Sequence, residues 1–352
     1  MNQVSDQRKN WISRLYPRGL PRLWCPLIVH YDQSGNIDRD RIRQHLVQIR
    51  PSVHAFLLFG STGDGWALSL AAKEELFQVY TELAEELELE LLIGVLKEKT
   101  SEVEVEICRW LELMTLKTGQ QDPVSAMLAC RVKGFTICPP HGADLSQDQI
   151  SDELKSLLRQ KVPFALYQLP QVTENEISPQ TLSRLAKEFP HFYLFKDTSG
   201  QDKVILAGLD YAGVRFVRGM EGDYSFWYGP GRTSYDGFLL SSANCFAPEL
   251  QQIIQLTDQG QSEPAEQLSR RVAAMMEAVF ADVAKITSGN AFTNANKCID
   301  HIFAFGEKWQ EQPAPVLQSG IRLPVQHLDY ACRQLTAQGW TVADGYLAKQ
   351  KE

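Results

Sequence analysis

The sequence predicts an α/β fold, a closed (β/α)8 barrel followed by a C-terminal helical extension. Short runs rich in Phe, Leu, Ile and Val recur eight times between residues 23 and 241, and most precede a longer stretch with helical spacing. The runs are nearly continuous in apolar character, as is typical of parallel strands buried on both faces. A closed barrel satisfies this pattern without an edge strand, and an open doubly wound sheet is the structural alternative.

The eight expected strands are spread over the first two thirds of the chain, with helices between them. Asp38 and Ser69 are cap residues at two helix starts, and Glu74 and Glu75 lie near the positive end of the second helix. The expected strands are 23–28, 55–59, 90–95, 134–138, 164–167, 192–196, 214–217 and 237–241. The expected helices are 38–49, 69–87, 101–116, 125–133, 147–159, 178–189, 202–209 and 223–228.

The pattern changes after the eighth run. Helical spacing continues over 248–259, 263–280 and 327–337, and no further strand is expected. We therefore expect three parts. These are an N-terminal segment (1–22), the barrel (23–245) and the helical extension (246–352).

Composition narrows the classes of partner. Lys and Arg number 35 against 43 Asp and Glu, which gives a formal charge of −8, and no block of basic residues occurs. Nucleic acid and anionic membranes are therefore not expected as partners, and a small molecule is. The polar start of the chain lacks a signal-peptide pattern and no run of eighteen apolar residues occurs, so we expect a cytoplasmic protein. The seven cysteines form no CxxC pair and are expected to be reduced thiols.

Several catalytic motifs are missing from the sequence. The loop 60–65 has the glycine spacing of a phosphate-binding loop, but Trp66 and Ala67 stand where such a loop needs Lys and Ser or Thr. No dinucleotide-binding fingerprint follows the first strand, and no GxSxG elbow is present. The histidines form no HExxH or HxH pair, so no metal is expected.

The candidate catalytic and binding residues instead lie at the carboxyl ends of the expected strands. Lys196 shares a strand face with Leu194, so its amine is expected in the barrel mouth, where loss of hydration would favour a neutral nucleophile. A solvated lysine, or one paired with Asp197, is the alternative. Tyr167 is either a proton-transferring phenol or a packed core aromatic. Ser61 and Thr62 carry neighbouring hydroxyls, which belong either to a carboxylate-binding loop or to an ordinary turn.

Together these strand ends resemble the dihydrodipicolinate synthase/N-acetylneuraminate lyase family, whose members are (β/α)8 TIM barrels with a C-terminal helical extension. The resemblance spans almost the whole chain. Its markers are Pro26, Gly35-Asn36-Ile37-Asp38, Gly60-Ser61-Thr62-Gly63-Asp64, Leu68-Ser69, Tyr167-Gln168-Leu169-Pro170, Lys196-Asp197-Thr198-Ser199-Gly200 and Arg322-Leu323-Pro324.

The resemblance implies a class I aldolase that needs no cofactor and no metal. Lys196 matches the family's Schiff-base lysine, and Tyr167 matches its acid/base phenol. Leu239 matches the aliphatic residue beside the bound keto acid, with a plain core leucine as the alternative. The loop that holds the 2-oxo-acid carboxylate matches Gly60, Ser61, Thr62 and Gly63.

Three departures from the family pattern limit what the resemblance implies, and one further acidic residue is a candidate for substrate contacts. His141 stands near the place of a relay tyrosine, and Val172 replaces an arginine that binds a carboxylate. Asp64 is shorter than the family's glutamate. Glu221 is a candidate for contacts with sugar hydroxyls, although a solvated loop acid is the simpler interpretation.

The leading hypothesis is a carbon–carbon (or carbon–oxygen) lyase of the Schiff-base aldolase type. It would act on a pyruvate-like 2-oxo acid with an aldehyde or sugar-acid co-substrate. The alternatives are a 4-hydroxy-tetrahydrodipicolinate synthase, which Val172 disfavours, and a barrel that binds a 2-oxo acid without turnover. By the same resemblance the chain is expected to be a homo-oligomer, a dimer or a tetramer.

Overall fold

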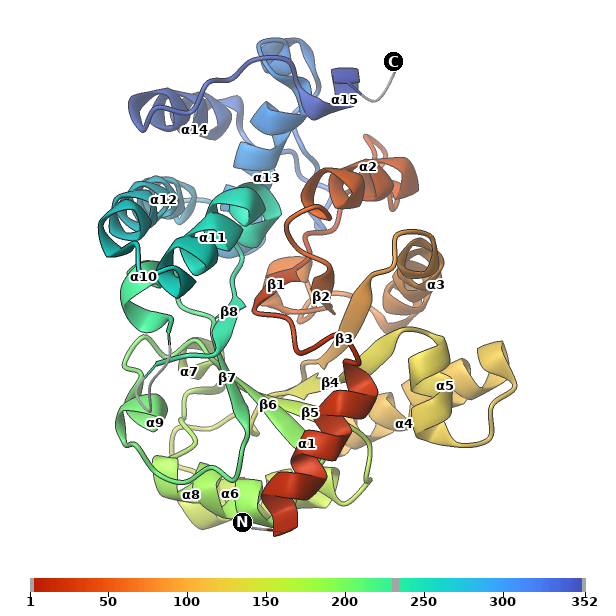
Figure 1. Cartoon of the computed structure of the whole chain (residues 1–352). Helices are drawn as coiled ribbons and strands as arrows, with labels where there is room; N and C mark the ends of the chain where they lie inside the picture. Colours follow the sequence, from red (N-terminus) through yellow and green to blue (C-terminus); the bar gives the residue numbers. More distant parts are fainter. Residues whose placement is uncertain (1–2, 230–233, 350–352) are drawn as a thin grey trace.

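The computed structural model, which describes residues 3–229 and 234–349, contains a closed barrel of eight parallel strands (Figure 1). The strands follow one another around the barrel in chain order, and the last pairs with the first. The expected (β/α)8 barrel is therefore confirmed, and the open sheet is excluded. The strands are β1 (Leu23–Pro26), β2 (Ala55–Leu58), β3 (Glu90–Val95), β4 (Val132–Ile137), β5 (Phe164–Gln168), β6 (Phe192–Asp197), β7 (Arg215–Arg218) and β8 (Gly237–Leu239).

Alternation along each strand divides its side chains between two apolar layers. Leu194, Val217 and Leu239 belong to the cluster that fills the barrel interior, whereas Phe195 packs in the layer between strands and helices. Both layers need apolar residues, which is why the strands read as continuous apolar runs. Lys196 is two residues beyond Leu194 and continues the inward face to the carboxyl end of the strand.

Helices surround the barrel, and two begin where side-chain caps were expected. Asp38 accepts a hydrogen bond from the Arg41 amide (2.9 Å), and Ser69 accepts one from the Ala72 amide (3.2 Å). The helices between strands are α2 (Arg39–Ile49), α3 (Leu70–Glu86), α4 (Thr100–Thr118), α5 (Pro123–Ala129), α6 (Gln147–Leu158), α7 (Pro170–Thr173), α8 (Pro179–Glu188), α9 (Lys203–Leu206) and α10 (Tyr224–Trp227).

The end of α5 corrects the sequence prediction. The helix expected over 125–133 stops at Ala129, because Arg131 takes a left-handed backbone conformation (φ 59°) that no helix can continue. Val132 then starts β4. The expected helix over 202–209 is likewise shorter, since Gly208 has φ 59°.

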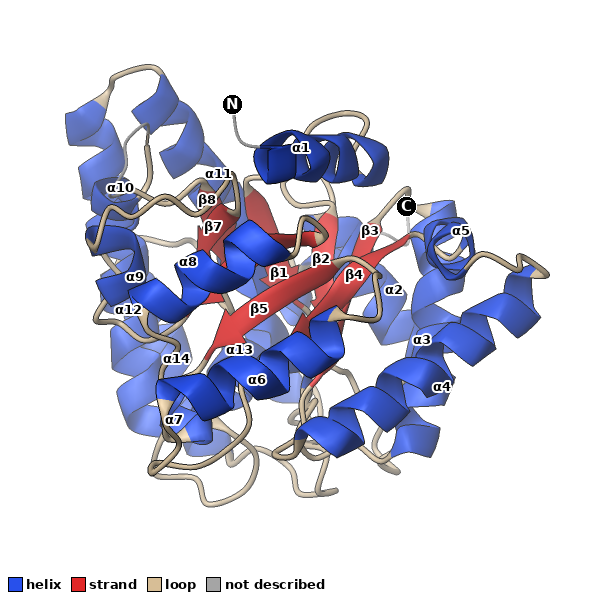
Figure 2. Ribbon diagram, turned by 90° about the horizontal axis from the view of Figure 1, so that it is seen from below, coloured by secondary structure: helices blue, strands red, loops and turns tan. Residues whose placement is uncertain are grey.

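An unpredicted helix, α1 (Gln3–Leu15), packs against the barrel at the end where the strands begin (Figure 2). Leu15 and Tyr16 join the interior cluster, and the Tyr16 hydroxyl bonds the Tyr193 hydroxyl (2.8 Å). Buried Arg8 donates to the backbone carbonyls of Phe192 and Phe189 (2.6 and 2.8 Å). The part of the chain expected only as an N-terminal segment thus closes one end of the barrel.

The C-terminal helices lie together beside the barrel (Figure 1). The first of them contacts β1 and α2, so it completes the helical ring, and the boundary expected at residue 245 falls inside it. None of the helices within 3–229 and 234–349 combines the length and hydropathy that a membrane span requires. These helices are α11 (Ala243–Asp258), α12 (Ser262–Val283), α13 (Ala291–Phe305), α14 (Val325–Ala337) and α15 (Tyr346–Lys349).

Candidate active site

A cavity of about 460 Å³ opens at the carboxyl ends of the strands. Its base carries predicted residues from β5, β6 and β8, and its wall includes residues from the C-terminal extension. This is the end of a (β/α)8 barrel at which ligands bind. The barrel residues in its lining include Ser61, Thr62, Tyr167, Lys196, Thr198, Gly219 and Leu239, and those of the extension are Gly289, Asn290, Phe292, Gln318 and Ser319.

Lys196 is the buried amine at the base of this cavity, with 4% of its surface exposed. Burial lowers the pKa of Lys196 to about 7, although the nearby Cys138 and Glu221 oppose this shift. Gly219 makes room for the side chain, because a Cβ there would lie 2.8 Å from Lys196 Cε and 2.1 Å from Thr198 Oγ1. A substantial fraction of the amine is therefore neutral at pH 7 and able to act as a nucleophile.

Tyr167 lies beside Lys196 because the two residues are register partners on β5 and β6. The Lys196 Nζ stands 3.8 Å from the centroid of the Tyr167 ring. Burial raises the pKa of Tyr167, and the Ser61 hydroxyl opposes this shift only in part. The phenol is therefore protonated at neutral pH and can donate a proton to a group bound on the amine.

The loop after β2 forms a 3-10 turn, η1 (Ser61–Gly63), at the edge of the cavity. Its glycines are required by close backbone packing, since a Cβ at Gly63 would lie 2.5 Å from the Leu27 carbonyl oxygen. The Ser61 hydroxyl accepts a hydrogen bond from the Trp66 indole (3.0 Å). Thr62 is buried in the same turn and also lines the cavity. Ser61 and Thr62 of this turn thus line the same cavity as Lys196.

The structure brings some of the other predicted residues to the cavity and not others. Leu239 and Val172 line it, whereas Gly60 and Gly63 shape the loop behind the lining. His141 is outside the lining and pairs with Glu174 (3.6 Å). Glu221 is also outside the lining, and four hydrogen bonds from Tyr224, Ser241 and Ser242 fix its carboxylate.

Sequence reasoning missed the residues that the C-terminal extension contributes to the cavity wall. Asn290 and Phe292 lie at the start of α13, a helix the periodicity did not predict. Thr198, noted only as part of a strand-end motif, is 4% exposed. Its hydroxyl lies close enough to Tyr167 to lower the phenol pKa, but it makes no hydrogen bond of standard geometry within the described residues. A helix start signal at Asn290 could have revealed α13, because its side chain caps the Thr293 amide (2.9 Å).

Comparison with known proteins bears directly on this arrangement. Residues 127–293 match the model of the dihydrodipicolinate synthetase family. This match, over just under half of the chain, supports the family expected from the sequence. The matched segment contains both Tyr167 and Lys196 and ends at Thr293.

Solved structures of the same family share the fold at low sequence identity. Dihydrodipicolinate synthase from Bacteroides thetaiotaomicron aligns with a TM-score of 0.70 and 17% identity, over 90% of this chain and 97% of that one. The synthase from Cyanidioschyzon merolae, solved with lysine bound, gives 0.68 and 17%, over 90% and 98%. YagE of E. coli K12, solved in complex with pyruvate, gives 0.68 and 14%, over 90% and 97%.

In this protein, α13 holds the loop that carries the Ser61 and Thr62 hydroxyls (the hydroxyl loop) through side chains on one helical face. The Asn290 amide donates to the Ser61 carbonyl (2.9 Å), and the Thr293 hydroxyl donates to the Thr62 carbonyl (2.8 Å). Lys297, one turn further on, opposes with its charge the rise in pKa that burial imposes on Asp64. The two hydrogen bonds fix the Ser61 and Thr62 carbonyls. Because a peptide N–H points away from the C=O of the same peptide group, they also fix the direction of the loop amides.

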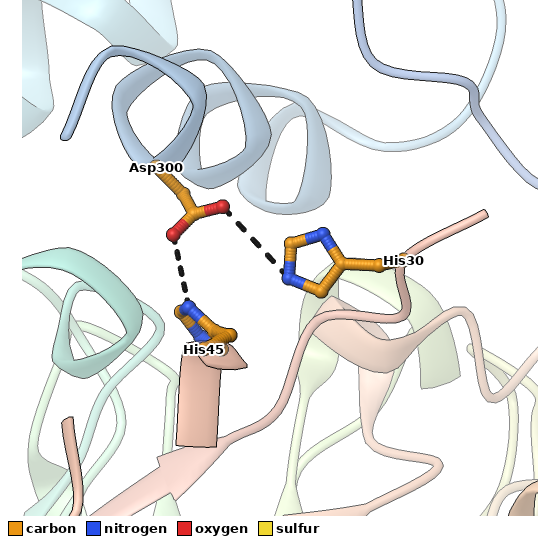
Figure 3. Close-up of side chains that lie close together, drawn as sticks. All are labelled: His30, His45 and Asp300. Atoms are coloured by element: carbon orange, nitrogen blue, oxygen red, sulfur yellow. Dashed lines mark hydrogen bonds and ion pairs between the residues drawn. The ribbon is translucent and has the colours of Figure 1, made fainter. Parts of the chain in front are cut away.

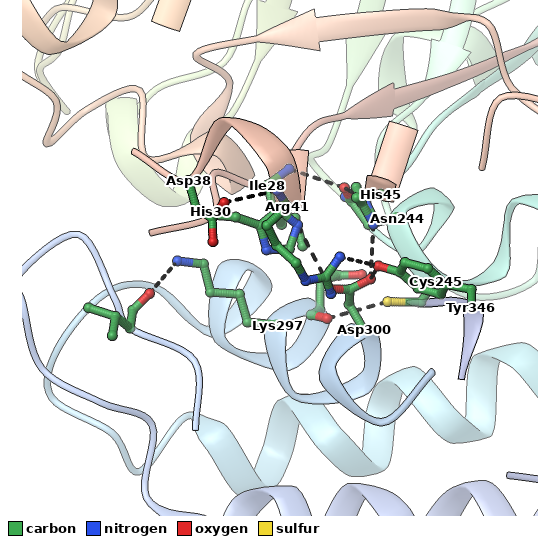
Figure 4. Close-up of polar contacts among 12 residues, drawn as sticks. Ile28, His30, Asp38, Arg41, His45, Asn244, Cys245, Lys297, Asp300 and Tyr346 are labelled. Atoms are coloured by element: carbon green, nitrogen blue, oxygen red, sulfur yellow. Dashed lines mark hydrogen bonds and ion pairs between the residues drawn. The ribbon is translucent and has the colours of Figure 1, made fainter. Parts of the chain in front are cut away.

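A buried charged network joins the same helix to the barrel (Figure 4). Asp300 of α13 pairs with Arg41 of α2 and accepts hydrogen bonds from His45 (2.9 Å) and Tyr346 (2.7 Å). The cations beside Asp300, with Arg41 foremost, hold its carboxyl pKa well below the usual range despite burial. His30 lies 3.8 Å from the Asp300 carboxylate, and its pKa is lowered by burial first and by Arg41 second.

His30, His45 and Asp300 have the spacing of a metal-binding group (Figure 3). Their ligand atoms lie within 4.8 Å of one another. However, the Asp300 oxygens already bond to Arg41, His45 and Tyr346, so a cation would have to displace a guanidinium. We interpret the group as an ion network that anchors α13, since a buried carboxylate with three partners is electrostatically satisfied.

The network makes stability depend on pH. His30 is held neutral in the folded state, so below its unfolded pKa of 6.5 the unfolded chain binds a proton that the folded chain does not. Stability is then lost as the pH falls, by up to about 1.4 kcal/mol per pH unit for this group. In urea titrations between pH 7.5 and 5, His30→Gln should show a shallower decline than the parent. Gln33→Asn, at the same small pocket, is the control, and an unchanged decline in His30→Gln contradicts the prediction.

The hydrogen bond from the Thr293 hydroxyl to the Thr62 carbonyl tests whether α13 stabilises the hydroxyl loop. Thr293→Val keeps the shape of the buried side chain but leaves the Thr62 carbonyl without its donor, which should lower the free energy of unfolding by about 1–3 kcal/mol. Thr336→Val removes an exposed hydroxyl bond within α14 and should cost less than about 0.5 kcal/mol. Equal losses in the two variants, measured by urea unfolding, would show that the bond to the loop has no special importance.

Proposed function

We propose that the protein is a lyase of the class I aldolase type that forms a Schiff base between Lys196 and a pyruvate-like 2-oxo acid. One observation carries the proposal. A buried amine with a pKa of about 7 stands 3.8 Å from the ring of a protonated tyrosine, at the base of a cavity. Few structural roles require a neutral lysine in that position, whereas imine chemistry does.

The proposed cycle begins when the neutral Lys196 amine attacks the keto carbon. The carbinolamine loses water, with Tyr167 passing the proton to the departing oxygen, and leaves a protonated imine. The positively charged imine nitrogen accepts electrons from the carbon next to the imine carbon. In the synthetic direction this neighbouring carbon loses a proton, and the resulting enamine attacks an aldehyde. In the reverse direction the carbon–carbon bond breaks and the aldehyde is released. Hydrolysis of the imine returns the amine and the 2-oxo acid.

Ser61 and Thr62 are proposed to hold the carboxylate of the 2-oxo acid. Both line the cavity above Lys196, and α13 fixes their backbone. A carboxylate bound by hydroxyl and amide donors needs no nearby arginine. Leu239 is proposed to support the apolar side of the keto acid from β8.

The family and its structures support the aldolase class more than one particular reaction. One neighbour is described with bound pyruvate, and others are named as synthases. A 4-hydroxy-tetrahydrodipicolinate synthase is the less favoured alternative, because the side chain of Val172 offers no charge to a second carboxylate. The cytoplasmic location, the dimer or tetramer, and roles for His141 and Glu221 stay predictions.

Reductive trapping tests the imine directly. Incubation with pyruvate and borohydride should add one reduced pyruvyl group to Lys196, identified by peptide mass spectrometry. Lys196→Met should abolish the label. Lys203→Met, which removes an exposed lysine, should leave it in place. A label on another lysine, or none, refutes the proposed mechanism for this donor, and pyruvate binding without a label would instead favour the non-catalytic barrel.

The rate of trapping should follow the ionisation of the amine. Because the pKa of Lys196 is lowered to about 7, the cyanoborohydride rate should rise about tenfold per pH unit below 7 and level off above it. Tyr167→Phe keeps the ring beside the amine and should keep this midpoint, while later proton transfer slows about 10²–10⁴-fold. A midpoint near 10.5, the ordinary value for lysine, would contradict the account.

A further inference from the structure

We propose that the co-substrate of this site is an uncharged, mainly apolar aldehyde, such as an aryl aldehyde, and that Trp66, Val172 and Phe292 select it. The inference rests on the proposed function and names the substrate class of the same site. It replaces the sugar-acid expectation with one drawn from the walls of the cavity.

The three selecting side chains come from separate parts of the fold and line one cavity. Trp66 follows the hydroxyl loop, Val172 lies in α7, and Phe292 belongs to α13. Trp66 packs against an apolar cluster that includes Tyr167 and Leu169. The side chain of Phe292 is supported from behind by Phe280, with ring centroids 5.0 Å apart. Trp66 and Phe292 are thus held by packing, whereas Val172 is partly exposed at the cavity wall.

Charge in the lining argues against a second carboxylate. Among the described lining residues Lys196 is the only cation, and it is used by the imine. The acidic lining residue, Asp64, accepts a hydrogen bond from Tyr31 (3.3 Å) and faces the charge of Lys297 behind the loop. A second carboxylate brought into this space would lose its hydration without gaining a cationic partner, which is unfavourable.

The neutral polar groups of the wall are mostly bonded already, which argues against a polyhydroxylated substrate. Gln171 donates to the Thr198 carbonyl (2.9 Å), and the amide of Asn290 is bound to the loop. The Ser319 hydroxyl bonds Ser288 (2.6 Å), and the Ser241 hydroxyl is donated to Glu221 (2.7 Å). Several sugar hydroxyls would therefore compete for partners that the protein already uses.

The hydroxyl of Thr198, a lining residue buried beside Lys196, makes no hydrogen bond of standard geometry within the described residues. A simple aldehyde has one oxygen, which becomes an alkoxide when the carbon–carbon bond forms. Because Thr198 and Lys196 both lie against Gly219, the Thr198 hydroxyl is a candidate donor to that oxygen. An aldehyde with a single oxygen needs no further donor from the wall.

The size of the space is consistent with two molecules. A volume of about 460 Å³ lies within the range of small-molecule sites and exceeds what a three-carbon acid occupies. Trp66, Val172 and Phe292 all line this cavity. A flat ring packed against Trp66 or Phe292 would exchange water for aromatic contact.

The test compares three aldehydes with pyruvate as the common donor, in the full chain. The probes are benzaldehyde, succinic semialdehyde as the carboxylated probe and glyceraldehyde as the hydroxylated one, and the product is measured by mass spectrometry. The value of kcat/KM for benzaldehyde should exceed the other two by at least about 50-fold. A carboxylated or hydroxylated aldehyde that reacts as well as benzaldehyde overturns the inference.

A charge placed in the wall should reverse the preference. Val172→Arg should shift the ratio of kcat/KM toward succinic semialdehyde by at least about tenfold, because the new guanidinium offers the missing carboxylate partner. Val105→Arg adds the same charge at an exposed site on α4 and should leave the ratio unchanged. An equal ratio in Val172→Arg and the parent would contradict the assignment of Val172.

Trapping on Lys196 separates this inference from the proposed function. If pyruvate and borohydride label Lys196 but benzaldehyde is not preferred, the aldolase stands and the substrate class is wrong. If Lys196 is not labelled, the aldolase mechanism fails and the substrate class fails with it.

Discussion

The proposed function depends on keeping one amine out of water. Lys196 ends an inward-facing row of β6 side chains, so the apolar interior that stabilises the barrel also removes the hydration of the ammonium group. The ring of Tyr167 and the missing side chain of Gly219 complete that environment, one by contact and the other by leaving space. The apolar packing that stabilises the barrel is therefore also what lowers the pKa of Lys196. The site should be most sensitive to substitutions that admit water into the barrel interior next to the amine.

The second constraint comes from outside the barrel. The C-terminal extension supplies α13, whose side chains hold the hydroxyl loop and whose carboxylate at Asp300 is buried against α2. Buried ion pairs contribute little net stability, but they define one arrangement because any other leaves a charge unpaired. We infer that the network at Asp300 sets the position of α13, and that α13 in turn sets the position of the loop.

Much of the fold could be predicted because strands buried on both faces must be apolar, and each of the eight runs corresponds to a strand. The inward direction of Lys196 followed from strand alternation alone. Helix α13 was missed although Ala295, Ile299 and Ile302 keep a helical spacing. Thr293, Lys297 and Asp300 are buried among them, and these polar residues masked the apolar period. The wall that it builds was missed with it. Contacts between distant segments, such as Asn290 with Ser61, leave no local pattern in a single sequence.

The attachment of the hydroxyl loop to α13 also has a consequence for biosynthesis. Ser61 and Thr62 are translated more than two hundred residues before Asn290 and Thr293, which fix their carbonyls. During synthesis the loop therefore cannot reach its final conformation until the C-terminal extension has been made, even if the barrel strands have already paired. The complete pocket forms late in translation, so an incomplete chain on the ribosome would carry Lys196 without the fixed loop proposed to bind the carboxylate.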